Sequence, residues 1–484
     1  MTIPKNSSAT AAPYQPRGLL VDGVWIAPGA TNTLYSPYDG AAIAEVPQGN
    51  SDTVDRAVAA AKLALDADGF ERHTRIDLLD AAVEQLRARQ EDFAQTIAIE
   101  CAKPIKTARL EAARTVDTFA FAAAEARTFA GDVVALDAVA SGRGKVAYTM
   151  RVPIGVVAAV APFNFPLNLV AHKVAPAIAV GCPVVLKPAS QTPLSALLLA
   201  EMLTDIGLPP GWLNVVTGGG AEVGGPLCAH PDVSYITFTG SPDVGWGIAA
   251  RAPKKRVRLE LGSNAPLIVD CDSDWQTAAA KAATAGFVQA GQSCVSTQRI
   301  FVHADIASGF REALAAGVSQ LTIGDPLSED VDVSAVISRK DALRIESWVN
   351  EAVSEGARLD IGGERIDNVI VPAVLSNVTP DMRVQCDEVF GPVVTVTEFD
   401  DFDTALEMAN DSRFGLNAGV YTSNVAKALK ATRRLEFGSV YINDVPTVRA
   451  DQQPYGGGKD SGNTREGPRY AMAEMTEPRL VTMQ

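Results

Sequence analysis

Between residues 153 and 259, apolar runs typical of β-strands alternate with longer segments typical of helices, and the connections are short. The strand-like runs lie near 155–160, 183–187, 213–217, 235–239 and 256–259. The helices between them are expected to start near Pro166, Thr192, Ala221 and Pro242. This alternation predicts a parallel, doubly wound α/β sheet with helices on both faces. Ligands of such sheets bind beyond the carboxyl ends of the strands, so site residues are expected there.

A second α/β region is expected from about residue 263 to residue 456. Its strands are expected near 266–270, 298–303, 369–372, 392–397 and 439–443. Its helices are expected near 274–290, 306–319, 340–354 and 402–410. Elsewhere, Asp22-Gly23 predicts a tight hairpin, residues 131–151 predict a second hairpin, and residues 478–483 predict an edge strand.

Charge and hydropathy exclude several classes of partner. The chain has 484 residues, enough for two or three domains, and a formal net charge of −15. This charge argues against nucleic acid and against anionic membrane surfaces as partners. No segment approaches the ~18–20 consecutive apolar residues of a membrane helix. Residues 1–17 lack the basic start and apolar stretch of a signal peptide, so a disordered N-terminal extension is expected.

The cysteines and histidines bear on location and on metal binding. The six cysteines are scattered without a CxxC pair, and the four histidines show no ligand spacing. We therefore expect a cytoplasmic, reducing location and no metal site. Cys182, Cys228 and Cys271 lie in apolar runs or helices, where a free cysteine is usually a buried filler. Cys294 differs, because residues 291–293 before it offer no apolar face.

Three side chains in separate motifs have the chemistry of an acyl-transfer site. Cys294 ends the turn Ala290-Gly291-Gln292-Ser293-Cys294, and Glu260 ends a short apolar strand. Asn164 lies between two prolines in Pro162-Phe163-Asn164-Phe165-Pro166. A thiol nucleophile, a carboxylate base and an amide donor together suit chemistry through a thioester. A cysteine protease or amidase would instead need a histidine base in a motif that pairs with the thiol, and none is visible.

In this order and at these spacings, the three motifs resemble those of the aldehyde dehydrogenase superfamily, and the resemblance covers about residues 18–484. It implies an α/β fold with a Rossmann-type cofactor domain, a second α/β catalytic domain and a small β oligomerisation extension. The cofactor domain would comprise residues 18–130 and 152–262, the catalytic domain residues 263–456, and the extension residues 131–151 and 457–484. Because related chains are dimers or tetramers, we expect a homodimer or homotetramer that pairs through the extension.

The resemblance also implies NAD- or NADP-dependent oxidation of a small aldehyde to its carboxylic acid. Cys294 would form a thiohemiacetal and then a thioester, Asn164 and the Cys294 backbone N–H would stabilise the oxyanion, and Glu260 would activate water for hydrolysis. A catalytically inactive relative would be expected to lack one of these three residues, and all three are present.

The expected cofactor residues lie in several short motifs, although the standard GxGxxG fingerprint is absent. The glycine triplet that ends at residue 220 fits a plain turn equally well, and Ser241 fits an ordinary helix N-cap. The resemblance assigns to the cofactor Gly220, Gly224, Gly240, Ser241, Glu388 and Phe390. Ser190 stands where NAD-specific members commonly carry an acid, and Lys187 precedes it by three residues. A 2′-phosphate would meet no repelling acid there, so NADP is expected to be used at least comparably with NAD.

Five further residues follow from the resemblance. Lys173 and Glu466 match a proposed proton-relay pair of the family. Asn168 and His172, together with Arg449, look like the branch that oxidises lactaldehyde, glyceraldehyde 3-phosphate or phosphonoacetaldehyde. Arg449 either faces a substrate anion or lies exposed in a loop.

His172 stands where semialdehyde enzymes often carry an arginine, which disfavours succinate semialdehyde. A semialdehyde dehydrogenase, such as succinate-semialdehyde dehydrogenase, is kept as the alternative function. A cysteine-dependent amidase or thioesterase is the alternative from a different class.

Overall fold

The alternation between residues 153 and 259 forms a seven-stranded sheet in the computed structural model, which describes residues 14–27, 29–67 and 69–484. Five parallel strands make up most of it: β7 (Val156–Val160), β8 (Val184–Lys187), β9 (Leu213–Val215), β10 (Val233–Thr239) and β11 (Arg256–Glu260). The hairpin of β1 (Leu19–Val21) and β2 (Val24–Ile26) adds antiparallel strands beside β9. Its turn is the predicted Asp22-Gly23, with φ of 54° and 73°, a conformation that suits a two-residue hairpin.

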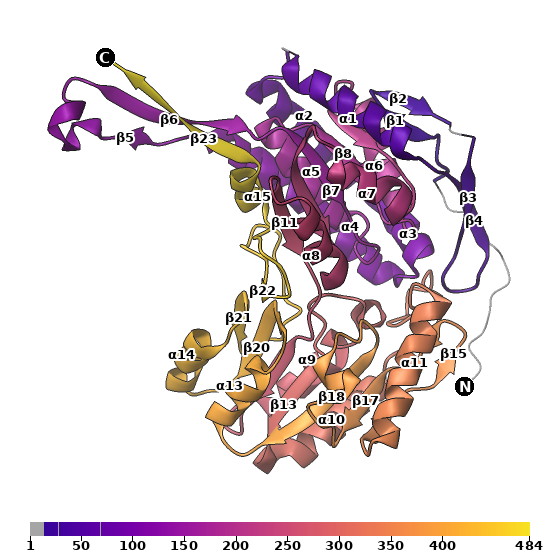
Figure 1. Ribbon diagram of the computed structural model, residues 1–484. Helices are drawn as coiled ribbons and strands as arrows, with labels where there is room; N and C mark the ends of the chain where they lie inside the picture. Colours follow the sequence, from indigo (N-terminus) through magenta and orange to yellow (C-terminus); the bar gives the residue numbers. More distant parts are fainter. Residues whose placement is uncertain (1–13, 28, 68) are drawn as a thin grey trace.

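Helices cover both faces of this first sheet, as predicted (Figure 1). One face packs on α1 (Ser51–Asp66) and α7 (Gly225–Ala229), with α8 (Pro242–Arg251) beside them. The other face packs on α2 (Arg72–Ala88), α3 (Gln90–Cys101), α4 (Ile105–Thr128), α5 (Asn168–Val180) and α6 (Leu194–Asp205). Alternate residues of β7 enter the two cores, Ala158 on the first face and Ala159 on the second, which explains why this strand is apolar throughout. Among the described helices, none is long and apolar enough to cross a membrane.

The second α/β region forms another seven-stranded sheet, in the order β14-β17-β18-β13-β12-β20-β21. Its strands are β12 (Pro266–Val269), β13 (Arg299–His303), β14 (Arg358–Ile361), β17 (Ala373–Ser376), β18 (Val393–Phe399), β20 (Asn417–Tyr421) and β21 (Ser439–Ile442). One face packs on α9 (Trp275–Ala285), α10 (Ala307–Ser319) and α11 (Arg339–Ser354). The other packs on α13 (Phe402–Asn410) and α14 (Val425–Arg434).

Two expectations for this region need correction. The strand expected at 369–372 divides: β16 (Val369–Ile370) pairs with β15 (Arg365–Ile366) in a separate hairpin, and the sheet strand is β17. Pro372 lies between the two strands and has no N–H for a ladder hydrogen bond. The helix expected through residue 290 ends at Ala285, since Gln289 and Ala290 adopt positive φ.

A three-stranded arm projects from the body (Figure 1) and consists of β5 (Val133–Val134), β6 (Val146–Pro153) and β23 (Thr476–Met483). The expected start of its second part, at residue 457, is too early. The bridge between Gly462 and Glu260 and the packing of α15 (Pro468–Glu474) on the first core place residues before β23 in the body. The small pairs β3 (Thr31–Tyr35) with β4 (Ala42–Pro47) and β19 (Phe414–Gly415) with β22 (Gly458–Lys459) complete the described sheets. The short helix α12 (Arg383–Cys386) lies against α11 and β18.

The expected N-terminal extension needs a similar correction. Residues 1–13 lie outside the described residues. Tyr14, however, is buried in the first core, and Arg17 forms an ion pair with Glu201 at 3.1 Å. The end of the expected extension, residues 14–17, therefore belongs to the folded body.

A buried ion pair fixes the segment that carries Asn164. Lys103 and Glu111 are both fully buried and contact each other. The Glu111 carboxylate accepts the backbone N–H groups of Leu167 and Asn168, at 3.0 and 3.1 Å, and so satisfies orphan donors at the start of α5. Lys103 Nζ donates to the backbone oxygen of Asn164 at 2.8 Å. The pair thus holds both ends of the turn between β7 and α5.

Lys103→Met should lower the free energy of unfolding by about 3–5 kcal/mol, because it leaves the Glu111 carboxylate buried without its cation. Lys106→Met is the matched control, since Lys106 pairs with Asp332 at the surface, with 42% of its side chain exposed. The control should change the free energy by less than about 1 kcal/mol. Urea unfolding of both variants measures the difference, and equal small losses would contradict this role for the pair.

Candidate active site

Cys294 lies in a strained turn before β13. The three residues Gln289, Ala290 and Gly291 have φ of 53°, 52° and 69°, and left-handed non-glycine residues cost about 1–2 kcal/mol each. A Cβ on Gly291 would lie 2.0 Å from the backbone oxygen of Gly391, so the turn packs closely against the backbone at residue 391. Burial raises the pKa of the Cys294 thiol to about 12, against the opposing effects of Tyr455 and Arg449. The turn therefore presents a half-buried thiol on a rigid support.

The Asn164 side chain reaches the same turn. Its Nδ2 donates to the backbone oxygen of Gln292 at 2.9 Å, and the residue is 4% exposed. Gln289 also donates to the backbone oxygen of Asn164. The predicted amide donor is therefore brought within two residues of Cys294, with its second N–H still available.

Glu260 ends β11, deep in the structure. Both carboxylate oxygens are buried and have no hydrogen-bond partner among the residues that the structure describes. A Cβ on Gly456 would lie 2.6 Å from Oε1, so a glycine is what leaves room for this carboxyl. Burial raises the pKa of Glu260 well above its ordinary value, and the nearby Glu466 raises it further. A buried, unpaired carboxyl with a raised pKa is typical of proton-transfer groups.

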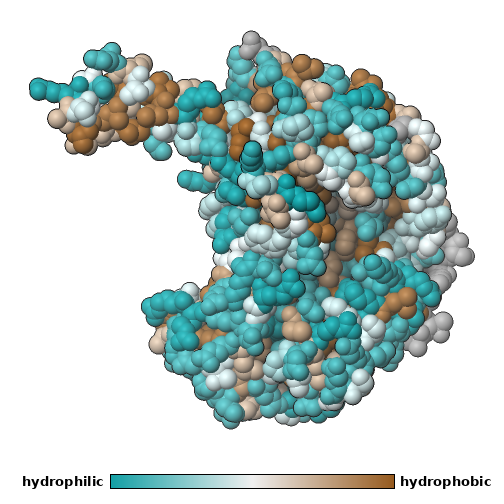
Figure 2. Space-filling view, viewed as in Figure 1, coloured by the Kyte–Doolittle hydropathy of each residue, from teal (hydrophilic) through white to brown (hydrophobic). Residues whose placement is uncertain are grey.

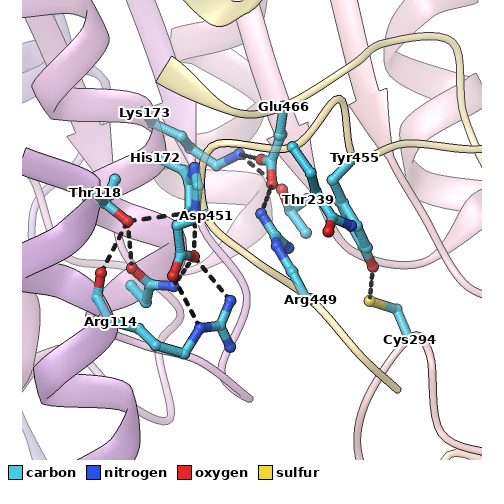
Figure 3. Close-up of polar contacts among 12 residues, drawn as sticks. Arg114, Thr118, His172, Lys173, Thr239, Cys294, Arg449, Asp451, Tyr455 and Glu466 are labelled. Atoms are coloured by element: carbon cyan, nitrogen blue, oxygen red, sulfur yellow. Dashed lines mark hydrogen bonds and ion pairs between the residues drawn. The ribbon is translucent and has the colours of Figure 1, made fainter. Parts of the chain in front are cut away.

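Lys173, Glu466 and Arg449 form one buried network (Figure 3). Lys173 Nζ lies 3.3 Å from Glu466 Oε1 and donates to Thr239 at 2.7 Å. Arg449 Nη2 lies 3.0 Å from Glu466 Oε2, with 9% of the arginine side chain exposed. Burial alone would raise the pKa of Glu466, but the two cations hold it down at about 2. The structure thus brings the predicted pair together, and the interpretation of Arg449 as an exposed loop residue is wrong.

Asp451 collects four side-chain donors in a second buried cluster (Figure 3). Asn168 Nδ2 and His172 Nε2 each lie 2.9 Å from Oδ1, and Arg114 donates from Nη2 at 2.8 Å and Nε at 3.0 Å. Thr118 lies beside them, 2.9 Å from the amide oxygen of Asn168. The two predicted substrate residues of α5 therefore hold the loop that carries Arg449.

Sequence reasoning missed three residues of this site: Arg114, Asp451 and Tyr455. Tyr455 Oη lies 2.8 Å from Cys294 Sγ, and the Arg449 guanidinium lies 3.8 Å from the centre of the tyrosine ring. Their partners are 161 to 337 positions away in the sequence, so no local motif marks them.

Three of the expected cofactor residues, Lys187, Gly220 and Gly224, line a cavity at the carboxyl ends of β8 and β9. The cavity has a volume of about 280 Å³, and Phe238 also lines it. A Cβ on Gly224 would lie 3.4 Å from the Lys187 side chain, and Gly220 has open space where its Cβ would be. Such a glycine-lined, partly apolar cavity fits the adenosine part of a dinucleotide.

Ser190 and Ser241 lie just beyond the carboxyl ends of β8 and β10, respectively. Ser190 is exposed and its hydroxyl donates to the backbone oxygen of Gly218 at 2.8 Å. Ser241 is the N-cap of α8, but its side chain makes no capping hydrogen bond there, and Gly240 precedes it at the end of β10. Both serines keep hydroxyl capacity for a ligand at this edge of the sheet.

Glu388 and Phe390 lie on the side of the second sheet. Glu388 Oε1 accepts the backbone N–H of Ser263 at 2.8 Å, and burial raises its pKa to about 7. A Cβ on Gly262 would lie 2.1 Å from this carboxylate. Phe390, with φ of 46°, packs edge-on against Phe163, 5.7 Å between ring centres, beside Asn164. These residues face the Asn164 turn across the boundary between the two sheets.

The other cysteines differ in exposure. Cys182 and Cys228 are buried as expected, but Cys271 is exposed, because it follows the end of β12 in a surface turn. Its sulfur lies with ligand atoms of Asp270 and His303 within 4.8 Å of one another. The Asp270 carboxylate is already paired with Lys427.

The model for the aldehyde dehydrogenase family matches residues 25–481. The chain is similar to a 3-sulfolactaldehyde dehydrogenase from Priestia megaterium, with 42% identity over 466 residues, 96% of this chain and 98% of that protein.

Two solved structures add detail. An aldehyde dehydrogenase from Physcomitrella patens in complex with the reaction product succinate is 40% identical, with a TM-score of 0.93 and 98% of both chains covered. An NADP-dependent glyceraldehyde-3-phosphate dehydrogenase from Bacillus halodurans complexed with NADP is 35% identical, with a TM-score of 0.94 and 97% and 99% of the two chains covered.

Proposed function

The chain belongs to the aldehyde dehydrogenase family, and we propose on that premise that its substrate is a small aldehyde with an anionic group at its far end. The protein is an NAD(P)-dependent aldehyde dehydrogenase that works through the cysteine mechanism of the family. The substrate proposal rests on the position of Arg449 and on its unpaired donor. Its guanidinium is one aromatic ring away from Cys294, and its Nε is buried without an acceptor among the described residues.

The charge around Arg449 supports an anionic ligand. Lys173 and Arg449 share a single carboxylate, Glu466, while the nearby Arg114 is balanced by Asp451. The Lys173, Arg449 and Glu466 group therefore carries one net positive charge, and an unused donor on a buried cation attracts an anion strongly. The names of the related enzymes agree with this class, since sulfolactaldehyde and glyceraldehyde 3-phosphate are small anionic aldehydes and succinate is an anionic acid.

We assign the chemical steps to five residues of this chain. The Cys294 thiolate attacks the aldehyde carbon, and the resulting oxyanion accepts hydrogen bonds from the free N–H of the Asn164 amide and from the Cys294 backbone N–H. Lys187, Gly220 and Gly224 would hold NAD or NADP at the cavity, and the cofactor would supply the hydride acceptor. Glu260 takes a proton from the water that attacks the thioester, whose C–S bond then breaks to release the acid and the Cys294 thiolate. Lys173 and Glu466 pass that proton outward.

Glu260→Gln should leave the first hydride step intact and stall hydrolysis of the thioester, because the amide cannot take a proton from water. Rapid mixing should then give one equivalent of reduced cofactor in a burst, followed by turnover at least about a hundredfold slower, within the 10²–10⁴-fold range of general-base catalysis. Mass spectrometry should find the acyl group on Cys294. A proportional loss of burst and steady rate, with no acyl-enzyme, would assign Glu260 an earlier step.

Matched aldehydes test the substrate class. Succinate semialdehyde against butanal, and glyceraldehyde 3-phosphate against glyceraldehyde, differ mainly in the anionic group. Arg449→Gln should lower kcat/KM for the anionic members by about 10- to 100-fold more than for the neutral ones, equivalent to ~1.5–3 kcal/mol for a hydrogen bond to a charged group. An equal loss for both members of each pair would sink the proposal that Arg449 binds the anion.

We also propose that the site accepts NADP at least comparably with NAD. Lys187 ends β8 at the cavity, where Nζ donates to the backbone oxygen of Pro188 at 3.0 Å. Burial lowers the pKa of Lys187, so an added phosphate would favour its charged form. Ser190, three residues on, places no negative charge beside it.

Ser190→Glu should selectively weaken NADP, by about five- to a hundredfold, because a like charge near a phosphate costs on the order of 1–3 kcal/mol. NAD binding should stay within about twofold. Ser190→Gln, of similar size and uncharged, is the control and should spare both cofactors. A parent protein that already prefers NAD by two orders of magnitude would refute this interpretation of Ser190.

The arm supports a proposal of subunit pairing, in a homodimer or a homotetramer. It bears exposed apolar side chains on β5, β6 and β23, among them Val133 at 87%, Val146 at 60% and Leu480 at 54% exposed (Figure 2). Both outer strands of its sheet also have an open edge. Sedimentation velocity at micromolar concentration should show an oligomer, and a stable, active monomer there would refute pairing.

We propose a reducing, cytoplasmic location because of the state of the cysteines. All six are free, including the exposed Cys271. Such thiols persist where glutathione and thioredoxin keep them reduced. Recovery of the protein from an oxidising compartment in cell fractionation would overturn this location.

A further inference from the structure

We propose that Tyr455 is a catalytic residue that activates the nucleophile: its hydroxyl donates a hydrogen bond to the Cys294 sulfur and stabilises the thiolate, while Arg449 holds and polarises its ring. This inference rests on the proposed role of Cys294 as the nucleophile. It assigns a task to a side chain that no motif marks.

The geometry fixes the tyrosine hydroxyl on the sulfur. Tyr455 is 2% exposed and packs with Val295 and Leu416 in a small apolar cluster that Cys294 joins. Its Oη lies 2.8 Å from Sγ. With a thiol, either atom can donate, but a thiolate can only accept, so the tyrosine must then be the donor. The contact therefore favours the charged form of the cysteine.

Tyr455 can act as the donor to Cys294 because its phenol stays protonated. Burial raises the pKa of Tyr455 well above its ordinary value, and the adjacent Cys294 raises it further. The phenol thus keeps its proton throughout the neutral range and remains a donor. When the thiolate forms, only the S–H bond breaks, and its proton leaves to water.

The charges near Cys294 determine how strongly the Tyr455 hydroxyl affects the pKa of the thiol. Glu260 and Glu388 oppose a thiolate, whereas Tyr455 and Arg449 favour it. Arg449 lies 3.8 Å over the tyrosine ring, a cation–π contact that draws electron density from the phenol and strengthens it as a donor. Since burial works against the thiolate, the hydroxyl and the guanidinium are the groups that offset it.

The hydroxyl also connects the nucleophile to the substrate residue. Arg449 contacts Glu466 on one side and the Tyr455 ring on the other (Figure 3). An anionic group that binds Arg449 would lie next to the ring that bonds the sulfur. The contact between Arg449 and Tyr455 would then serve both recognition of the anion and activation of the thiol.

Tyr455→Phe tests the proposal, because it removes only the hydroxyl. The readout is the rate at which iodoacetamide alkylates Cys294 between pH 7 and pH 9 without substrate, measured by mass spectrometry of the Cys294 peptide. Below its pKa the thiolate fraction falls tenfold for each unit that the pKa rises, and a hydrogen bond to a charged group is worth about one such unit. We therefore expect about tenfold slower alkylation and a pH profile of kcat/KM that moves about one unit upward.

Two further variants complete the test. Tyr441→Phe is the control, because it removes a tyrosine hydroxyl from β21 that accepts a hydrogen bond from Gln453 Nε2 at 2.9 Å and not from the thiol. Alkylation of Cys294 should not change in this variant. Arg449→Gln keeps the hydroxyl but removes the cation, and should slow alkylation by about threefold or more. Thermal unfolding of each variant checks that the fold is intact, and Arg449→Gln carries the test if Tyr455→Phe does not fold.

Unchanged alkylation in Tyr455→Phe, or in Arg449→Gln where Tyr455→Phe is unfolded, would overturn the proposal and leave Tyr455 a packing residue. Because the assay needs neither aldehyde nor cofactor, this outcome is distinct from failure of the proposed function. That failure would appear as a parent protein that oxidises none of the anionic aldehydes.

Discussion

Buried charges on one loop hold the candidate site together. Residues 445–467 run between the two seven-stranded sheets, and two of their carboxylates are buried where an unpaired charge would cost several kcal/mol. Asp451 satisfies this demand with Arg114, Asn168 and His172 from the first body. Glu466 satisfies it with Lys173 and Arg449. Because both carboxylates need these partners, the contacts fix the path of the loop.

That path places Tyr455 and Gly456 of the loop against Cys294 and Glu260. Gly456 leaves room for the Glu260 carboxyl, which stays unpaired and keeps a raised pKa. Tyr455 meets the sulfur of Cys294, and Arg449 lies behind the tyrosine ring. Asn164 arrives independently, on a turn held by the buried Lys103 and Glu111. The carboxyl proposed as the base, the thiol proposed as the nucleophile and the amide proposed as the oxyanion donor are thus placed by separate parts of the chain.

The sequence predicted what is local and missed what is long-range. The two α/β regions followed from runs of apolar residues, and Cys294, Glu260 and Asn164 followed from short motifs. Arg114, Asp451 and Tyr455 could not be found in this way, because their roles depend on partners far away along the chain. Strand β17 was misplaced for a local reason, since Pro372 divides an apolar run that looked continuous. Strand β20 and helix α14 were not predicted, the first because glycine and asparagine weaken its strand signal. The assignment of roles to the site residues remains a prediction, and so does the division into domains apart from the boundaries at residues 17 and 457, which the structure corrects.

The central claim is that Cys294 is the nucleophile of an aldehyde dehydrogenase. Cys294→Ala, assayed with the matched anionic aldehydes and either cofactor, tests it most directly. We predict that reduced cofactor no longer forms above background, while NAD and NADP still bind with the affinity of the parent, because the cavity around Lys187 and Gly224 does not include the thiol. Substantial aldehyde oxidation by that variant would contradict it.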